Sequence, residues 1–186
     1  MVGLPGRRAH ASAGTADFSS RLLPKILDEQ KLEKLQTLNV LDFGRAYGPS
    51  LELFNRYSCR LCVLDLAEPL LEWSASLAEY EELPSNHQLE AELGSLLAQA
   101  RDVRFDLLFL WDTLNHVHPH ALTAFASVLK RSLAPGFVGH GFLLHKRGVE
   151  QKLRSMGLKD EETIALRDEK SADLYAPNRK VVNEAL

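Results

Sequence analysis

The sequence predicts an α/β fold in three layers, with a mostly parallel sheet covered by helices on both faces. Two observations lead to this prediction. Short apolar runs, of which FDLLFLW at 105–111 is the clearest, recur along the chain, and segments with apolar residues at helical spacing separate them. Runs that are apolar throughout are typical of parallel strands buried on both faces. With 186 residues, 45% of them apolar and 25% charged, the chain has the size and composition of one globular domain.

The elements follow one another in an alternating order. The strands are predicted at 38–43, 59–66, 105–111 and 137–146, with a weaker candidate at 163–166. The helices are predicted at 19–35, 49–57, 68–80, 89–100, 121–133 and 148–156. Pro49 suits a helix start, and the triplet Ala134-Pro135-Gly136 is a stop signal. We expect Gly157 to end the helix before it, and residues 173–179 to form a turn ahead of a short terminal helix.

The N-terminal segment, the net charge and the cysteine content indicate the domain boundary and the cellular compartment. We expect residues 1–18 to form a disordered tail and residues 19–186 to form the domain; Arg7 and Arg8 also give the tail some likeness to a transit peptide. No apolar run reaches the length of a membrane helix, and a net charge of −3 gives no signal for nucleic acid. Two cysteines form no disulfide framework, so we expect a cytoplasmic protein.

The turn after the first sheet strand is the first candidate site. In open α/β sheets, ligands bind beyond the carboxyl ends of the strands. Here the chain reads DFGRAYG at 42–48, where Gly44 removes a Cβ from the path of a ligand and Gly48 allows close entry to the next helix. Asp65 ends the second strand and can accept hydrogen bonds from ribose hydroxyls. These residues allow either a dinucleotide site or a site for another nucleoside cofactor.

At this point the sequence resembles class I S-adenosylmethionine-dependent methyltransferases, which have a Rossmann-like fold. Asp-x-Gly-x-Ala-x-Gly at 42–48 is similar to the first motif of that family, and VLDL at 63–66 holds the matching ribose-binding acid. FDLLFLWDTLNH at 105–116 resembles the fourth-strand motif, LKRSLAPG at 129–136 resembles the helix end before strand five, and MGL at 156–158 resembles the segment before strand six. The resemblance spans about residues 35–160.

The resemblance implies S-adenosylmethionine as cofactor and methyl transfer to an unknown acceptor, which we expect to be a small molecule. The residues it assigns to the cofactor are Asp42, Gly44, Arg45, Ala46, Tyr47, Gly48, Asp65, Leu66, Trp111 and Asp112. Because the cofactor itself carries the activated methyl group, a protein base is optional. Asp112 and His116 are the catalytic candidates, since they lie just past the fourth strand.

Departures from the family pattern keep alternatives open. Ala46 replaces a glycine, Arg45 and Tyr47 are bulky, and residues 81–102 contain no clear third strand. These departures favour a second interpretation, a catalytically silent methyltransferase-like domain used for binding or assembly. A third interpretation, an NAD(P)-binding protein, is disfavoured by Asp42. A missing sheet edge could be supplied by a second copy of the chain, in a homodimer.

Two further patterns suggest metal or redox chemistry, and we interpret both as structural. His116, His118 and His120 alternate, but Pro119 places them in a loop and no further ligand follows at metal-binding spacing. Cys59 and Cys62 fall on a predicted strand, where a separation of three sends their side chains to opposite faces. We therefore predict no metal site and no redox pair.

Overall fold

The computed structural model describes residues 15–28, 32, 37–143 and 152–171. Within them the chain forms two sheets, one parallel with four strands and one antiparallel with three. The parallel sheet consists of β2 (Leu38–Asp42), β3 (Cys59–Val63), β4 (Phe105–Trp111) and β5 (Leu133–Gly141). The antiparallel sheet consists of β1 (Thr15–Ser19), β6 (Lys152–Leu158) and β7 (Thr163–Ser171).

Short and medium-length helices connect the strands. The α-helices are α1 (Leu23–Ile26), α3 (Gly48–Phe54), α4 (Ala67–Ser76), α5 (Asn86–Leu96) and α6 (Leu122–Lys130). Single 3₁₀ turns lie at η1 (Leu77–Glu79), η2 (Ala98–Ala100), η3 (Thr113–Asn115) and η4 (Pro119–Ala121). Ser85 begins α5 with a capping box, in which its hydroxyl accepts from the Gln88 N–H while the Gln88 side chain accepts from the Ser85 N–H.

The parallel sheet has the strand order β3-β2-β4-β5, and all three neighbouring pairs are parallel. The chain runs from β2 outward to β3 and then returns past β2 to β4 on its other side. The strand order therefore reverses beside β2, and the carboxyl ends of β2, β3 and β4 meet at this switch point. In sheets of this kind, such a switch point is where ligands bind.

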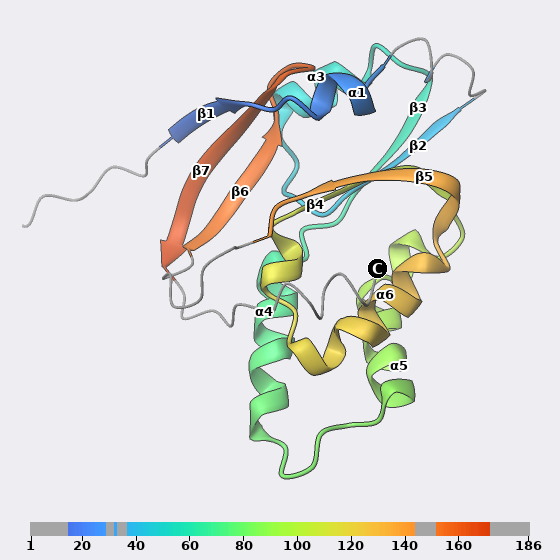
Figure 1. Ribbon diagram of the computed structural model, residues 1–186, viewed down its shortest axis with the longest axis vertical. Coiled ribbons are helices and arrows are strands. Elements are labelled where there is room, and N and C mark those ends of the chain that lie inside the picture. The colour runs from blue at the N-terminus through green and yellow to red at the C-terminus, as the bar shows by residue number, and fades with distance from the viewer. Residues whose placement is uncertain (1–14, 29–31, 33–36, 144–151, 172–186) are drawn as a thin grey trace, which may run out of the picture.

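One face of the parallel sheet is covered by helices α4, α5 and α6, which are drawn below the sheet in Figure 1. The core on this face joins side chains of all three helices to Leu41 of β2 and Leu108 of β4. Leu70 of α4 and Leu93 of α5 are completely buried in it. The helical spacing of the leucines along 67–100 is therefore explained by burial against the sheet.

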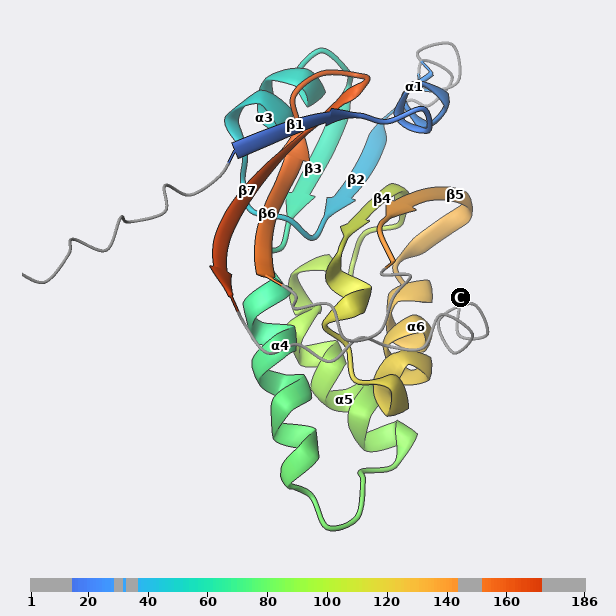
Figure 2. The ribbon, with the colours of Figure 1, turned by 60° about the vertical axis from the view of Figure 1, so that its left-hand side comes forward.

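The opposite face is covered by α1, α3 and the antiparallel sheet, as Figure 2 shows. Val40 and Phe109 of the parallel sheet share this second core with Leu158 of β6 and Ile164 of β7. All four side chains are fully buried. The antiparallel sheet thus forms part of the third layer, and it is held to the parallel sheet by side-chain packing.

Several sequence expectations are confirmed and others need correction. The four parallel strands lie where the apolar runs predict them, although β5 already begins at Leu133 and bulges before Val138 around Gly136, whose φ is 78°. The helix predicted at 148–156 is wrong from residue 152 onward, because 152–158 is strand β6. Of the helix predicted at 19–35, the described residues show the short helix α1 and a further helical residue at Leu32. Residues 15–18 of the expected tail belong to β1.

Three further expectations concern residues 81–102, the two cysteines and the C-terminal segment. The structure has a helix, α5, and no strand between residues 81 and 102. Cys59 packs into the second core and Cys62 into the first, on opposite faces as expected, and both thiols are free. The turn at 173–179 and the short helix after it lie outside the described residues.

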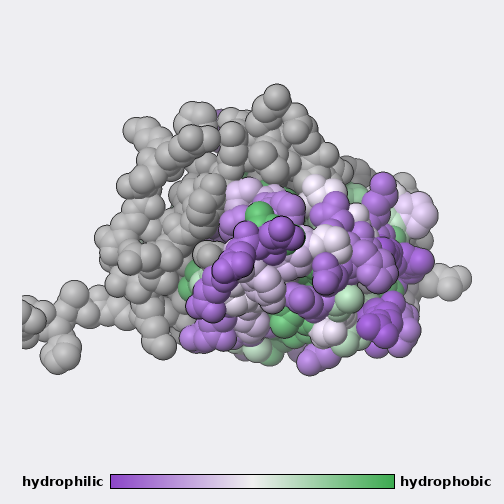
Figure 3. Space-filling view, turned by 90° about the horizontal axis from the view of Figure 1, so that it is seen from below, coloured by the Kyte–Doolittle hydropathy of each residue, from purple (hydrophilic) through white to green (hydrophobic). Residues whose placement is uncertain are grey.

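The end of the molecule farthest from the antiparallel sheet has a mainly hydrophilic surface. Figure 3 shows this end, where the described side chains are mostly polar and hydrophobic ones appear in scattered places. None of the helices in the described part of the chain is both long and apolar enough to span a membrane.

Candidate functional site

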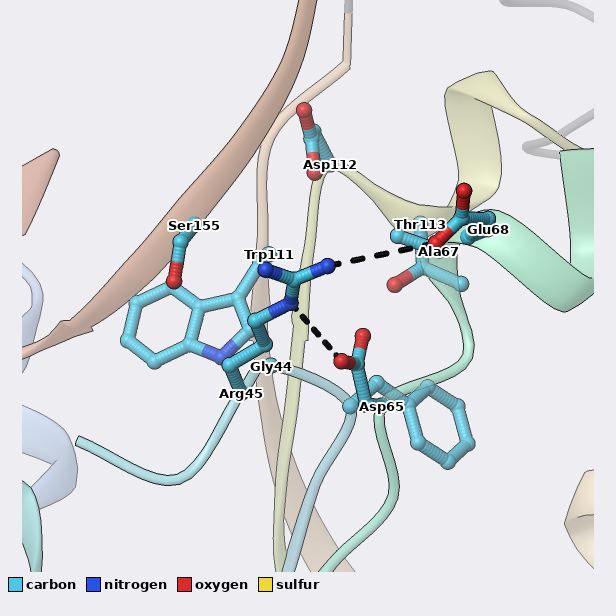
Figure 4. A pocket seen from close by; sticks show the side chains of 10 residues that line it. Gly44, Arg45, Asp65, Ala67, Glu68, Trp111, Asp112, Thr113 and Ser155 are labelled. Carbon is cyan, nitrogen blue, oxygen red and sulfur yellow. Dashed lines mark hydrogen bonds and ion pairs between the residues drawn. The ribbon is translucent and has the colours of Figure 1, made fainter. Parts of the chain in front are cut away.

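A small pocket lies at the switch point, beyond the carboxyl ends of β2, β3 and β4. The residues that line it are Phe43, Gly44, Arg45, Asp65, Ala67, Glu68, Trp111, Asp112, Thr113 and Ser155. Most of them follow directly on one of the three strands, and Ser155 comes from β6 of the antiparallel sheet (Figure 4). The sheet topology thus brings three separate stretches of sequence together, and β6 adds a fourth.

Asp42 lies behind this pocket as the last residue of β2. Its side chain is 2% exposed, and its Oδ1 accepts hydrogen bonds from the Gly44 N–H at 2.8 Å and from the Trp111 Nε1–H at 2.5 Å. Burial raises the pKa of the Asp42 carboxyl from 3.8 to about 6, and the hydrogen bonds from Trp111 and Gly44 oppose that rise. The carboxylate therefore fixes the glycine turn and the indole relative to each other.

Trp111 forms the wall between Asp42 and the pocket. Among the described residues it alone combines a side chain with a positive φ, 48°, a conformation that L residues rarely adopt. Its ring is 2% exposed, stacks on Phe109 with centroids 5.3 Å apart, and reaches Asp42 through the indole nitrogen. Backbone strain of this kind persists only where the surroundings hold the residue in place.

The glycine turn is covered by the protein's own atoms. A Cβ at position 44 would lie 2.7 Å from the Trp111 Nε1 and 2.8 Å from the carbonyl oxygen of Met156. Gly44 is therefore required for the close approach of Trp111 and β6 to the turn. The sequence predicts a different role for this glycine, which is to admit a ligand.

Strand β6 is also joined to the helix that follows the turn. The Tyr47 ring packs so closely on Gly157 that a Cβ there would lie 2.6 Å from it. Ser50, which is 2% exposed, accepts from the Leu158 N–H at 2.8 Å and donates to the Leu158 carbonyl at 3.1 Å. These contacts fix β6 over the loop at 44–50.

Arg45 occupies the mouth of the pocket. Its Nε donates to the Asp65 Oδ2 at 2.8 Å, and its Nη2 lies 4.0 Å from the Glu68 Oε2. Figure 4 shows the guanidinium group reaching across the pocket from the glycine turn to these two acids. The acid expected to bind ribose hydroxyls therefore already has a partner from the same chain.

The space left between these side chains is small. The volume open to water is about 20 Å³, room for about one water molecule. Pockets for small-molecule ligands usually enclose roughly 300–1,000 Å³. In this conformation, the pocket is too small for a nucleoside.

Asp112 lines the pocket, and His116 lies behind it. The His116 Nε2 is 3.6 Å from the Asp112 Oδ2, which is beyond hydrogen-bond distance. His116 is 1% exposed, and neither of its ring nitrogens has a hydrogen-bond partner among the described residues. The two residues suggested by the sequence as catalytic candidates are thus neighbours, with only Asp112 accessible from the pocket.

The structure brings about half of the expected site residues into the pocket lining: Gly44, Arg45, Asp65, Trp111 and Asp112. The others lie around it in different ways. Ala46 and Gly48 are exposed, Leu66 is buried in the first core, and Tyr47 faces β6.

Five further residues line the pocket without being among those that the sequence predicts for the site: Phe43, Ala67, Glu68, Thr113 and Ser155. Four of these residues lie within the expected motifs or within two residues of them. Their place next to the predicted site residues is the signal that could have identified them. Ser155 could not have been found in this way, because the segment around it was interpreted as a helix.

Two of the three alternating histidines after β4, His118 and His120, form contacts within and between loops. The ring nitrogen Nδ1 of His118 accepts from the His120 N–H at 3.3 Å, and the His120 Nε2 lies 3.1 Å from the Pro84 carbonyl oxygen. Within the described ranges, no group of three or more histidine, cysteine or acidic side chains is arranged to hold a metal ion.

The fold and the site together define a class of protein. A glycine turn after the first strand of a parallel sheet, an acid at the end of the second strand and a switch-point pocket are the features of a nucleoside-binding α/β domain. Residues 40–136, just over half of the chain, match the family described as "Methyltransferase domain". The chain therefore belongs to the class I S-adenosylmethionine-dependent methyltransferase superfamily. Comparisons with curated proteins and with solved structures gave no match.

The cofactor implied by this family can be tested against the residues present. The polar groups fit an adenosyl group, because Asp65 follows β3 across from the glycine turn and further polar side chains line the same pocket. The space does not fit while Arg45 lies across the pocket mouth. The residues therefore suit the cofactor chemically, but the pocket can hold it only if the Arg45 side chain moves away.

Proposed function

We propose that the protein is an S-adenosylmethionine-dependent methyltransferase that acts on a small-molecule acceptor. The observation that carries the proposal is the position of Asp65 at the carboxyl end of β3, facing the glycine turn of a chain that belongs to the methyltransferase-domain family. The bound cofactor would supply a methyl group already activated by a sulfonium centre. The chain's own task is then to bind, to orient and to exclude water.

The pocket residues can be assigned to this task. Asp65 would bind the ribose hydroxyls, and the backbone around Gly44 would face the rest of the cofactor. Asp112 would face the acceptor and receive its proton where the acceptor must lose one, and His116 lies buried 3.6 Å behind it. Trp111 would close the inner wall, since its indole is already fixed by Asp42.

A second candidate, a silent domain for binding or assembly, is favoured by one observation. The pocket has room for about one water molecule, and Arg45 forms an ion pair with Asp65, the acid that a cofactor would need. Under this candidate the purified protein has no methyl turnover, whether or not it binds a nucleoside. Mass spectrometry of small molecules released from the protein identifies any bound nucleoside, NAD included, and an assay of methyl transfer from S-adenosylmethionine separates the two candidates.

Substitution of Asp65 tests the assignment directly. We expect Asp65→Ala to weaken binding of S-adenosylhomocysteine by about ten- to a hundredfold, because hydrogen bonds to a charged group contribute roughly 1.5–3 kcal/mol. Isothermal titration calorimetry measures the change. Asp102→Ala is the matched control, since Asp102 is an exposed acid before β4, at the opposite end of the strand from the pocket. Equal affinity of the two variants for S-adenosylhomocysteine would show that Asp65 does not contribute to binding.

A further inference from the structure

Arg45 is placed so that it takes the position a ligand would occupy. It directly follows Gly44, and its side chain lies across the pocket mouth with Asp65 and Glu68 as its acidic neighbours (Figure 4). The Asp65 oxygen that accepts from the Arg45 Nε at 2.8 Å is one of the two oxygens that ribose hydroxyls would need. Arg45 and a nucleoside therefore compete for the same acceptor.

The ion pair of Arg45 is weak enough to be displaced. The side chains of Arg45 and Asp65 are 47% and 46% exposed, and Glu68 is 49% exposed. Water screens a pair of this kind, so a ligand with well-placed hydroxyls can replace it. A buried pair would close the site permanently, whereas this one is suited to open and close.

The charges around Arg45 add a preference among ligands. Three acids line the pocket, Asp65, Glu68 and Asp112, and Arg45 is the one basic side chain among the lining residues. When its charge is removed, the remaining acids attract a cation more strongly. The loss of Arg45 should therefore favour a ligand with a sulfonium charge over its neutral thioether counterpart.

We propose that Arg45 is an internal competitor at Asp65, which closes the nucleoside pocket at rest and must leave before a cofactor can bind. The inference rests on the proposed function, because it assumes that the pocket takes an adenosyl ligand. It also explains why a pocket lined by the polar residues of a cofactor site has a volume of only about 20 Å³.

The test compares four proteins in calorimetric titrations with S-adenosylhomocysteine and with S-adenosylmethionine: the wild type, Arg45→Gln, Arg45→Lys and Arg131→Gln. Arg131 is the matched control, since it is an exposed arginine paired with Glu90 at the junction of α5 and α6. We expect Arg45→Gln to bind S-adenosylhomocysteine about two- to fivefold more tightly than the wild type, the range that an exposed ion pair allows. The gain for S-adenosylmethionine should be larger. Arg45→Lys keeps the charge and should stay near the wild type, as should Arg131→Gln.

The possible outcomes separate the inference from the function on which it rests. Binding by Arg45→Gln alone, or tighter binding by it than by the wild type, supports the inference. Equal binding by both would overturn the inference and leave the proposed function in place. Weaker binding by Arg45→Gln would also overturn it, because Arg45 would then be a ligand contact. Failure of every protein to bind either compound would overturn the proposed function together with the inference.

Discussion

Asp42 shows how a single residue connects the fold to the pocket. Its carboxylate is buried, yet it accepts from the backbone of the glycine turn and from Trp111. A carboxylate that ionises at such a depth loses hydration, and the two hydrogen bonds replace only part of it. The residue that is typical of the family motif therefore has a structural role here: it orients the turn and the indole.

The raised pKa of Asp42 leads to a prediction about stability and pH. Its pKa is about 6 in the folded protein and close to 3.8 when unfolded, so between these values the folded state binds more protons. The free energy of unfolding should therefore fall as pH rises from about 4 to above 6, by up to about 3 kcal/mol from this group. Urea unfolding at several pH values measures this change.

Asp42→Asn is the variant that isolates this effect. The amide oxygen can still accept from Gly44 and Trp111, while the titrating charge is gone. We expect the loss of stability across pH 4–6 to be smaller in the variant than in the wild type. A variant with the same pH dependence as the wild type would show that other groups cause it.

At the scale of elements, the contact between strand β6 and the loop before α3 decides how the pocket is closed. The loop presents Tyr47 to Gly157 and α3 presents Ser50 to Leu158, so the turn, the helix and the strand form one packed unit. The position of β6 also brings Ser155 to the pocket. The antiparallel sheet thereby contributes to the site as well as to the core.

Gly157 tests this contact. We expect Gly157→Ala to destabilise the protein by about 1–3 kcal/mol, because the added methyl group would lie 2.6 Å from the Tyr47 ring. The matched control is Gly48→Ala, where a Cβ meets no atom within 4 Å. That variant should be neutral or more stable by up to about 1 kcal/mol. Thermal or urea unfolding compares the two, and equal destabilisation in both would argue against the contact.

Much of the parallel sheet could be predicted because its signal is local. A run such as 105–111 is apolar at every position except Asp106, as expected for a strand buried on both faces. The antiparallel sheet gives a weaker signal, since β1 and β7 pair across more than 140 residues of sequence. Residues 152–156 fit a helical pattern as well as a strand, and the pairing of β6 with β7 decides between them.

The candidate site was predictable to a similar extent and for related reasons. Gly44 and Asp65 follow strands whose ends must meet, so their proximity to one pocket follows from topology alone. The ion pair of Arg45 with Asp65 depends on where a long, flexible side chain comes to rest, and no sequence spacing specifies that. The same holds for Trp111, whose positive φ depends on packing around Asp42 and Phe109.

At the scale of the whole molecule, the two sheets share one hydrophobic core. The second core contains Val40 and Phe109 from the parallel sheet and Leu158 and Ile164 from the antiparallel sheet, so neither sheet can separate without exposing apolar surface of the other. The closed pocket lies where the two sheets meet, between β4 and β6. Opening of the pocket by Arg45 alone would leave this shared core intact.

This arrangement predicts that the two sheets unfold together. The chain has two tryptophans, Trp73 packed against the first core and Trp111 in the second, so Trp73→Phe leaves Trp111 as the only tryptophan. We expect its fluorescence and the far-ultraviolet circular dichroism of the same variant to give one urea midpoint, as a two-state transition requires. A transition at Trp111 that came clearly before the loss of helical signal would show that the antiparallel sheet detaches first. The pocket would then open by movement of β6, in addition to any displacement of Arg45.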